Sequence, residues 1–322
     1  MSQTEPHHRT HDAGRNSGNQ LLKALMTGHT IRTTLTTMKA AAAQQPFAWA
    51  ARSDERDGSS RPFLKWAGGK RQLLPQLLRY VPPGFNRYYE PFIGGAALYF
   101  ALRPKQAILG DFNARLARSY LGVRNDVESV IRLLRSYPHS RAFFDAFRRQ
   151  QIDTGADADV AAWLIYLNRT AYNGLYRVNR ANEFNTPFGS YGNPTICDPD
   201  LLRTCAAALQ NAEILIGDFE TTVSGAQNGD FVYFDPPYLP LSTFSDFTRY
   251  TNTPFNEKDQ IRLRDVARTL KQRGVAVLLS NSSAPRVREL YGEGFEMIEV
   301  EASRAVNCKA EKRGKVTELL IR

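Results

Sequence analysis

Cysteine is scarce in this chain of 322 residues. Its three cysteines, Cys197, Cys205 and Cys308, include no pair separated by two residues. Structural zinc sites and disulfide frameworks both need several cysteines at short spacing, so the sequence argues against either. Few, unpaired thiols are typical of proteins kept in a reducing compartment.

Histidine is missing from most of the chain. Four of the five histidines lie in the first 29 residues, and only His139 stands beyond them, in a polar stretch before a predicted helix. Histidine is the usual base of a catalytic triad and a common metal ligand. We therefore expect no metal site and no Ser-His-Asp hydrolase. The chemistry must be carried by carboxylates, backbone groups and aromatic rings.

Long apolar runs are also absent. No stretch reaches the length of about 18 residues that a membrane helix needs, so no membrane association is expected. Lys and Arg number 42 against 32 Asp and Glu, which gives a net charge of +10 and a pI near 9.6. A basic surplus favours a polyanionic partner.

Acidic residues do not occur between Asp12 and Asp54, and residues 1–60 are rich in Gln, Thr, Ala and Arg. This composition resembles a transit peptide, in which QLLKALMTGH would form a short amphipathic helix. It also suits a disordered basic extension, which is the interpretation we favour.

From residue 61 on, apolar runs typical of buried strands alternate with helical stretches. In the clearest helix, Asn256 is a candidate N-cap and Gly274 follows the last turn. Alternating strands and helices predict an α/β fold with a parallel, Rossmann-like sheet. The predicted strands are RYYEPF (87–92), QAILGD (106–111), AEILIGD (212–218), DFVYFD (230–235), VAVLLSNS (275–282), FEMIEVE (295–301) and VTELLIR (316–322).

These strands fall into two blocks, separated by a helical and polar stretch rich in Arg, Asn and Tyr. Such an arrangement indicates a doubly wound domain with a second module inserted into it. We therefore predict one domain made of residues 61–121 and 212–322, and an inserted helical domain over residues 122–211.

Acidic residues stand at the ends of four successive predicted strands. Binding sites on doubly wound sheets lie at the carboxyl ends of the strands, which here carry Glu90, Asp111, Asp218 and Asp235. Asp111 follows Gly94 by 17 positions, close to the spacing of about 20 at which an acid binds the hydroxyls of a ribose.

The same strand ends offer further contacts to a nucleoside. The turn from Phe92 to Gly94 lets a ligand approach the backbone, since glycine carries no side chain. Asp218 can accept from an adenine amino group while the ring of Phe219 stacks on the base. Together with Asp111, these residues predict an adenosine site.

A phosphate cradle is not present beside this adenosine site. FLKWAGGKRQ lacks the first glycine and the Ser or Thr of a P-loop, and FIGGAALYF lacks the spacing of a dinucleotide-binding loop. A pocket lined by acids repels phosphate and attracts cations. It would accept the sulfonium and ammonium groups of S-adenosylmethionine as cofactor.

The stretch FDPPY, which contains Asp235, Pro236, Pro237 and Tyr238, indicates methyl transfer to a base amine. The lone pair of such an amine is delocalised into the ring. Two acceptors aimed at its two hydrogens would make it more nucleophilic. The carboxylate of Asp235 and the carbonyl of Pro236 can serve as these two acceptors. Pro237 stiffens the turn, and Tyr238 can stack on a base rotated out of its helix.

From about Phe63 onward the sequence resembles the Dam-type, alpha-ordered DNA adenine-N6 methyltransferases. FLKWAGGKRQLLPQL is similar to the family's first cofactor motif, EPFIGGAALYF to its glycine motif, LGDFNARL to its ribose motif and FDPPY to its catalytic motif. Ala96 departs from the pattern, because a third glycine often stands there. The resemblance implies that Trp66 covers the methionine end or the adenine of the cofactor and that Lys70 holds its carboxylate.

The family fold implied by this resemblance is a seven-stranded class I methyltransferase sheet whose last strand is antiparallel. Its target-recognition hairpin resembles NRTAYNGLYRVNRANEFNTPFGSY, in which Asn173-Gly174 predicts a type I′ turn. Leu175 could wedge between bases and Arg177 could read a guanine edge, whereas Arg169 and Arg180 are typical of phosphate contacts. The hairpin match suggests the target sequence GATC.

Two alternatives stay open at this point: an N4-cytosine DNA methyltransferase, which more often has Ser in place of Asp235, and an inactive DNA-binding relative. Methylation at cytosine C5 is excluded because none of the three cysteines follows a proline. We expect a monomer without an obligate protein partner that acts on double-stranded DNA in the cytoplasm, associated with the nucleoid. The sequence leaves open whether it serves restriction-modification, a phage or housekeeping methylation.

Overall fold

The structure of the chain is a computed structural model that describes residues 61–239, 255–303 and 315–322. All of the described residues fall in one compact unit, Ala48–Arg322. The extension predicted over residues 1–60 lies outside the described residues, as does Cys308.

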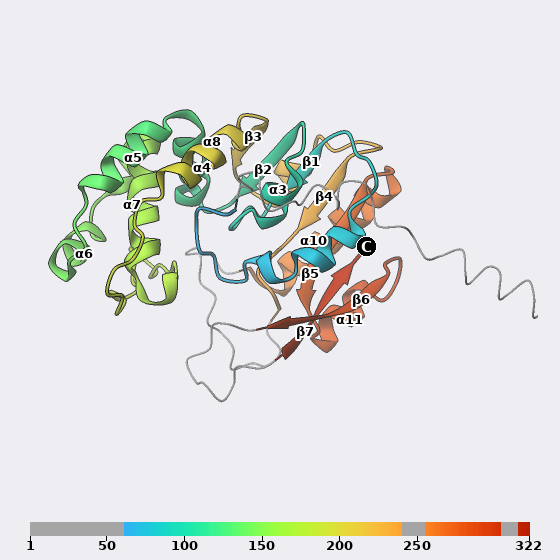
Figure 1. The fold of residues 1–322 in the computed structure, drawn as a ribbon. Helices are drawn as coiled ribbons and strands as arrows, with labels where there is room; N and C mark the ends of the chain where they lie inside the picture. The colour runs from blue at the N-terminus through green and yellow to red at the C-terminus, as the bar shows by residue number, and fades with distance from the viewer. Residues whose placement is uncertain (1–60, 240–254, 304–314) are drawn as a thin grey trace, which may run out of the picture. The chain divides into compact units, whose positions relative to one another are not determined.

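A seven-stranded sheet forms the centre of the described residues, as predicted (Figure 1). Its strands are β1 (Tyr88–Glu90), β2 (Ala107–Asp111), β3 (Ala212–Ile216), β4 (Phe231–Phe234), β5 (Ala276–Ser282), β6 (Met297–Ser303) and β7 (Lys315–Ile321). The order across the sheet is β3-β2-β1-β4-β5-β7-β6. The first five of these strands are parallel, whereas β7 is antiparallel to both β5 and β6. The α/β class and the antiparallel last strand are thus confirmed.

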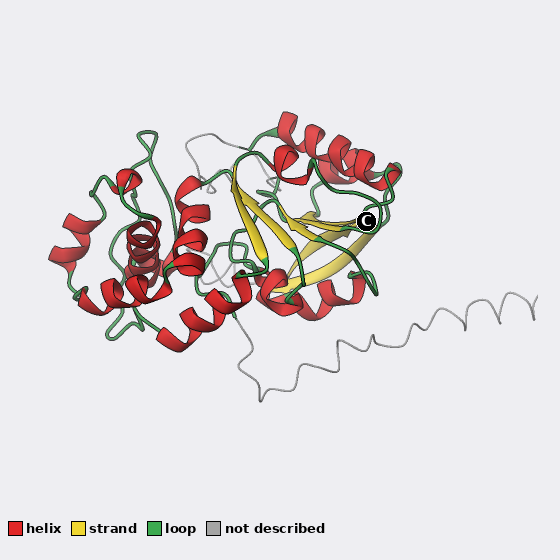
Figure 2. Cartoon of the chain, turned by 90° about the horizontal axis from the view of Figure 1, so that it is seen from above, coloured by secondary structure: helices red, strands yellow, loops and turns green. Residues whose placement is uncertain are grey.

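Two hydrophobic cores lie on opposite faces of the sheet, because alternate side chains of a strand point to opposite sides. On β4, Phe231 and Tyr233 belong to one core, and Val232 and Phe234 belong to the other. Figure 2 shows helices on both sides of the strands. The second core is closed by α9 (Phe219–Val223), α10 (Glu257–Gln272) and α11 (Pro285–Tyr291).

The first core continues from the sheet into the helical region. Helix α7 is buried along most of its length and packs against α4. The helices around this core are α2 (Leu74–Leu77), α3 (Ala97–Leu102), α4 (Ala114–Asn125), α5 (Val127–Ser136), α6 (Arg141–Phe147), α7 (Asp157–Thr170) and α8 (Pro199–Leu209). Short 3-10 turns occur at η2 (Lys70–Gln72), η3 (Leu78–Tyr80), η4 (Ile152–Thr154) and η5 (Tyr172–Gly174).

The clearest helix signal in the sequence is confirmed in α10. The Asn256 side chain accepts from the backbone N–H of Lys258 at 2.8 Å, and Asp259 accepts from the N–H of Asn256 at 2.9 Å. These reciprocal bonds satisfy donors that the first turn of a helix leaves unpaired. Gly274 follows the helix with a φ of +78°, a conformation that glycine adopts without strain.

The turn predicted at Asn173-Gly174 forms, but the chain does not reverse there. Both residues have positive φ, and the N–H of Leu175 donates to the carbonyl of Tyr172 at 3.2 Å. The antiparallel bridges pair 171 with 188 and 178 with 184, so the hairpin folds back between 179 and 183. The prediction was wrong on this point, because a local turn signal does not say which flanking segments pair.

No helix in the described parts of the chain is long and apolar enough to cross a membrane.

Candidate active site

The strand ends highlighted by the sequence meet at one edge of the sheet. Strands β2, β1 and β4 are parallel neighbours, so Asp111, Glu90 and Asp235 stand at or just beyond adjacent carboxyl ends. The winding of the sheet reverses between β1 and β4, since β2 and β3 lie beyond β1 and β5 lies beyond β4. Such a reversal opens a crevice in which doubly wound sheets bind ligands.

The glycine turn after β1 brings backbone close to this crevice. Gly94 has a φ of +44°, and a Cβ placed on it would lie 3.0 Å from Cδ1 of Trp66. The backbone conformation therefore favours glycine, and the close approach of the tryptophan ring leaves little room for a side chain. Ala96, the position at which the family often has glycine, also adopts the left-handed region, with φ 52° and ψ 38°.

Asp111 is linked to this turn through its carboxylate. One oxygen accepts from the N–H of Asn113 at 2.8 Å, and the other accepts from the N–H of Gly94 at 3.5 Å. Burial raises the pKa of Asp111 to about 6, while the two backbone donors act to lower it. A carboxylate held this way beside a glycine turn keeps lone pairs available for a pair of ribose hydroxyls.

Asp218 and Phe219 come together near the same edge, but each has protein partners. Asp218 caps α9 by accepting from the N–H of Glu220 at 3.0 Å, and it pairs with Arg262 at 2.7 Å. Phe219 stacks on Phe92, with ring centroids 5.4 Å apart, and the Arg262 guanidinium lies 4.6 Å from the Phe219 centroid. The predicted adenine contacts of Asp218 and Phe219 stay predictions, since these partners already give both residues a structural role.

Asp235 meets Lys70 rather than standing alone. The Lys70 ammonium, on a residue only 5% exposed, lies 2.8 Å from the Asp235 carboxylate and 4.8 Å from the centroid of the Tyr238 ring. Burial raises the pKa of Asp235 to about 6, the charge of Lys70 lowers it, and the charge of Glu318 raises it. The resemblance assigned Lys70 to the cofactor carboxylate, whereas in this structure it contacts the predicted catalytic carboxylate.

A buried polar network that the sequence analysis missed holds the segment after Asp235. Gln260, on α10, donates to the carbonyl of Pro237 at 2.9 Å and accepts from Asn281 at 3.0 Å. Ser282 donates to the carbonyl of Leu239 at 2.7 Å. Nothing in the described part of the chain donates to the carbonyl of Pro236. The run Ser-Asn-Ser that ends β5 was the available signal, since three polar residues at the end of a buried strand need partners.

Glu90, at the end of β1, differs from the other acids. It is 3% exposed and accepts from the hydroxyl of Tyr88 at 2.8 Å. Burial disfavours its charged form and raises its pKa to about 8, further than the pKa of Asp111 or Asp235 is raised.

The segment predicted to read DNA is fastened to the residues that precede Lys70. Asn168 accepts from the N–H of Lys65 at 2.8 Å and donates to the carbonyl of Gly174 at 2.7 Å. Trp66 stacks on Tyr176, with ring centroids 5.5 Å apart and planes at 23°. Because Trp66 also lies against Gly94, one aromatic pair connects this segment to the glycine turn.

The predicted DNA-reading side chains lie on one arm of the hairpin. Asn173 is exposed, and Leu175 and Arg177 are half-buried. The Arg177 carbonyl accepts from the N–H of Asn185 at 3.0 Å, which holds its backbone in the hairpin. Arg169 is fixed instead by a bond of 2.7 Å from its guanidinium to the carbonyl of Phe63. This bond gives Arg169 a structural role, and its contact with phosphate stays a prediction.

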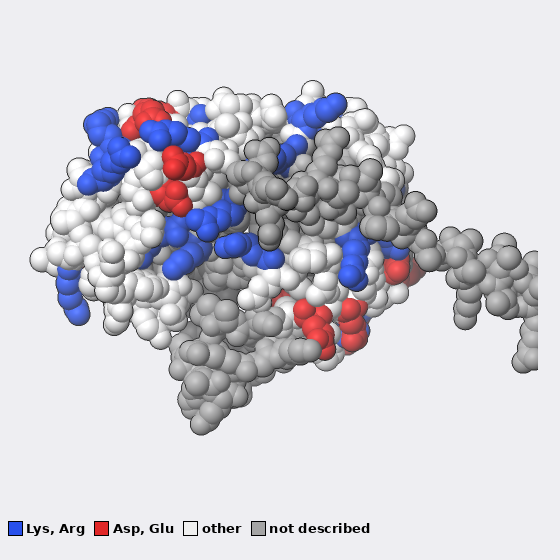
Figure 3. Space-filling model, in the orientation of Figure 1, with Lys and Arg blue, Asp and Glu red and all other residues white. Residues whose placement is uncertain are grey.

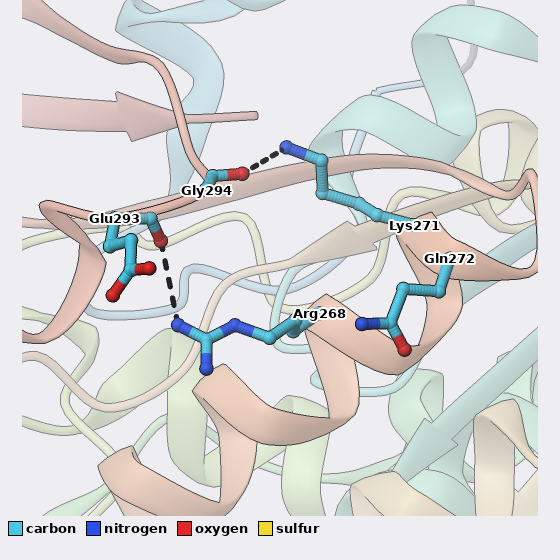
Figure 4. A pocket seen from close by; sticks show the side chains of 5 residues that line it. All are labelled: Arg268, Lys271, Gln272, Glu293 and Gly294. Carbon is cyan, nitrogen blue, oxygen red and sulfur yellow. Dashed lines mark hydrogen bonds between the residues drawn. The ribbon is translucent and has the colours of Figure 1, made fainter. Parts of the chain in front are cut away.

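A surface pocket of about 430 Å³ lies away from this edge; Figure 4 shows the side chains that line it. It is lined by Arg268, Lys271 and Gln272 at the end of α10 and by Glu293 and Gly294. Helix α10 leads into the start of β5, so its end lies toward the amino ends of the parallel strands. Lys271 is bound to the carbonyl of Gly294 at 2.7 Å. We therefore do not place the active site in this pocket.

Known proteins match this chain over its catalytic region. The model of the D12 class N6 adenine-specific DNA methyltransferases matches residues 66–306. The type II methyltransferase M1.LlaDCHI of Lactococcus lactis subsp. cremoris is 45% identical over 269 residues, 81% of this chain and 94% of the relative. M.MjaIII of Methanocaldococcus jannaschii, also a type II methyltransferase, is 42% identical over 284 residues, 81% and 98%.

The DNA adenine methylase of Escherichia coli K12 is 33% identical over 265 residues, which are 81% of this chain and 94% of that protein. These matches confirm the family, the activity class and the methyl donor that the sequence motifs implied. The chain belongs to the D12 class of N6 adenine-specific DNA methyltransferases, enzymes that use S-adenosylmethionine as methyl donor.

Proposed function

We propose that this protein methylates the N6 amine of an adenine rotated out of double-stranded DNA. The observation that carries the proposal is the position of Asp235, whose carboxylate stands directly after β4 with Lys70 at 2.8 Å. Asp235 and the carbonyl of Pro236 would accept the two amine hydrogens, and Tyr238 would stack on the base. Bound S-adenosylmethionine supplies an electrophilic methyl group.

The cofactor would lie along the strand ends on the β2 side of Asp235. We propose that Asp111 binds its ribose and that Asp218 and Phe219 contact its adenine. The cofactor would come close to the backbone at Phe92 and Gly94. Trp66, which lies against Gly94, would cover it. Lys70 would hold its carboxylate only after leaving Asp235, so we expect this lysine to change partner when the cofactor binds.

DNA would bind where the helical region meets the sheet. Lys and Arg side chains gather across the middle of the face in Figure 3. Lys65 and Arg169 are close enough that the charge of Arg169 helps lower the pKa of Lys65, after burial. Clustered cations of this kind favour a polyanionic backbone. We propose residues 122–211 as the target-recognition region, and residues 61–121 with 212–322 as the methyltransferase domain.

Methylation mapping tests the proposed function directly. The protein would be expressed in a bacterial host that lacks adenine methylation, and modified positions would be read by sequencing. We expect N6-methyladenine at one short sequence, with GATC as the candidate. N4-methylcytosine would favour the cytosine alternative, and an unmodified genome bound by the protein would favour an inactive relative. Sedimentation with and without a duplex would test our proposal that it acts as a monomer on chromosomal DNA.

Arg177→Ala should reduce discrimination at one base pair beside the target adenine while general DNA affinity survives. A bidentate contact from arginine to guanine discriminates by about 1–3 kcal/mol against the wrong base. The measurement is methylation of a cognate duplex and of duplexes altered at single positions, at two salt concentrations.

The matched control is Arg180→Ala, at the exposed hairpin reversal. It should weaken binding to all sequences alike and flatten the salt dependence. An equal effect of Arg177→Ala on every duplex would show a phosphate contact only.

Methyl transfer should decline as the pH falls through about 6, because Asp235 must be ionised to accept from the amine and burial raises its pKa to about 6. Above that pH the carboxylate is charged and activity is complete; below it, activity should fall about tenfold per pH unit. The measurement is kcat/KM for DNA. Saturating cofactor keeps the proposed ribose site at Asp111 occupied, so the profile reports the ionisation of Asp235 and not that of Asp111. The charge of Lys70 lowers this pKa and is expected to leave Asp235 when the cofactor binds, so the midpoint with saturating cofactor should lie at or above pH 6. A flat profile through pH 6 would contradict the assigned role of Asp235.

A further inference from the structure

The phenol of Tyr238 is anchored by a residue from the last strand of the chain. Its hydroxyl donates to the Glu318 carboxylate at 2.7 Å, across 80 positions of sequence. Glu318 is half-buried on β7 and pairs in register with Ser282 of β5. Within the described residues, this is the one hydrogen bond made by the Glu318 side chain.

The backbone on both sides of Tyr238 is fixed without Glu318. Gln260 holds the carbonyl of Pro237 at 2.9 Å, and Ser282 holds the carbonyl of Leu239 at 2.7 Å. Both of these side chains are at least 97% buried, with exposures of 1% and 3%. With the backbone held, the freedom that remains at Tyr238 is rotation of its side chain, and a bond to the phenol oxygen stops that rotation.

The ring held in this way faces the site of chemistry. The Lys70 ammonium lies 4.8 Å from the ring centroid and 2.8 Å from Asp235. A group placed over the ring therefore comes next to the catalytic carboxylate. A flat base stacked on the ring would enter from the same side, so a tilt of the ring would move its amine away from Asp235.

We propose that Glu318 is a positioning residue, which fixes the ring of Tyr238 so that the stacked target base presents its amine to Asp235. This inference rests on the proposed function, since it deepens the role of the same site. Burial, together with the charges of Asp235 and Glu318, raises the pKa of the Tyr238 phenol well above its ordinary value. The phenol thus stays protonated and available as a donor.

A double-mutant cycle tests whether Glu318 acts through the phenol. Glu318→Ala and Tyr238→Phe each break the bond from one side, and the second keeps the ring for stacking. Each should lower the single-turnover rate about tenfold, the scale for loss of a hydrogen bond to a charged group. The double variant should be no slower than either single variant, because the same bond is lost only once. The affinity for S-adenosylmethionine should not change.

Glu318→Gln separates the bond from the charge. Its amide oxygen still accepts from the phenol, so this variant should keep at least half of the wild-type rate. A loss near that of Glu318→Ala would overturn the proposal, because it would show that the negative charge matters instead. Effects that multiply in the double variant would overturn it as well. If Glu318→Ala does not fold, as judged by thermal unfolding, the comparison of Glu318→Gln with Tyr238→Phe still decides.

The fluorescence of 2-aminopurine at the target position adds a readout that a merely structural role would not move. Base rotation should still raise the fluorescence in Glu318→Ala, but stacking on a loose ring should quench less of it than in the wild type. Equal quenching in both proteins would count against the proposal. A failure of the proposed function would give a different result from a failure of the Glu318 proposal. In that case the wild type would methylate no adenine, or Asp235→Ala would remain active.

Discussion

Asp235→Ala should abolish methyl transfer and leave the fold intact. The carboxylate stands directly after β4, and in the proposed mechanism it orients the target amine. Removing a preorganised hydrogen-bonding group from an active site costs about 100-fold or more in turnover. Single-turnover transfer of a labelled methyl group to duplex DNA measures the loss, and circular dichroism and thermal unfolding report the fold.

The matched control for this experiment is Asp200→Ala. Asp200 lies on α8 and its side chain is 98% exposed, so its loss removes a carboxylate without touching the crevice. This control should keep wild-type activity. If Asp235→Ala retained more than a tenth of the wild-type turnover, the catalytic assignment would fail. Asp235→Ala also removes the ion pair with Lys70. This loss should not change turnover further, because in the proposed mechanism Lys70 has already left Asp235 when the target base enters.

Asp111→Ala should weaken the binding of S-adenosylmethionine by roughly 10- to 100-fold and leave the affinity for DNA nearly unchanged. Its carboxylate is held by the N–H groups of Asn113 and Gly94 at the glycine turn. Hydrogen bonds from ribose hydroxyls to a charged acceptor contribute about 1.5–3 kcal/mol, which corresponds to that range of dissociation constants. Isothermal calorimetry measures the change.

Asp218→Ala provides the contrast for Asp111→Ala. Asp218 was also predicted to touch the cofactor, yet it caps α9 and pairs with Arg262 at 2.7 Å. Its loss should cost about 1 kcal/mol of stability as a missing cap, with a smaller effect on cofactor binding than Asp111→Ala. An unchanged dissociation constant in Asp111→Ala would mean that the ribose is bound elsewhere. Asp111→Asn, which keeps an acceptor for the Gly94 N–H, guards against collapse of the turn.

The positions of the strands, and of the acids that follow them, can be read from the local sequence. Buried parallel strands are near-continuous apolar runs, and a chain can place an acid after such a run only where the strand leaves the core. Each of the seven predicted runs overlaps one strand of the sheet, although β6 continues past its run to Ser303 and β7 begins one residue before its run, at Lys315. Asp111 and Asp235 were selected in the same way, because a strand end can be recognised in the local sequence; their roles in cofactor binding and catalysis stay predictions.

The contacts between side chains that are distant in the sequence depend on the folded arrangement of the strands and helices. Lys70 reaches Asp235, Gln260 reaches Pro237, and Glu318 reaches Tyr238 across 80 positions. No local pattern encodes these contacts, because they depend on strand order and register, which follow from the packing of all seven strands together. The hairpin shows the same limit: Asn173-Gly174 fixed the local turn, but pairing across the hairpin placed the reversal between 179 and 183. Sequence periodicity is local, whereas the partners of a buried polar group are set by the whole fold.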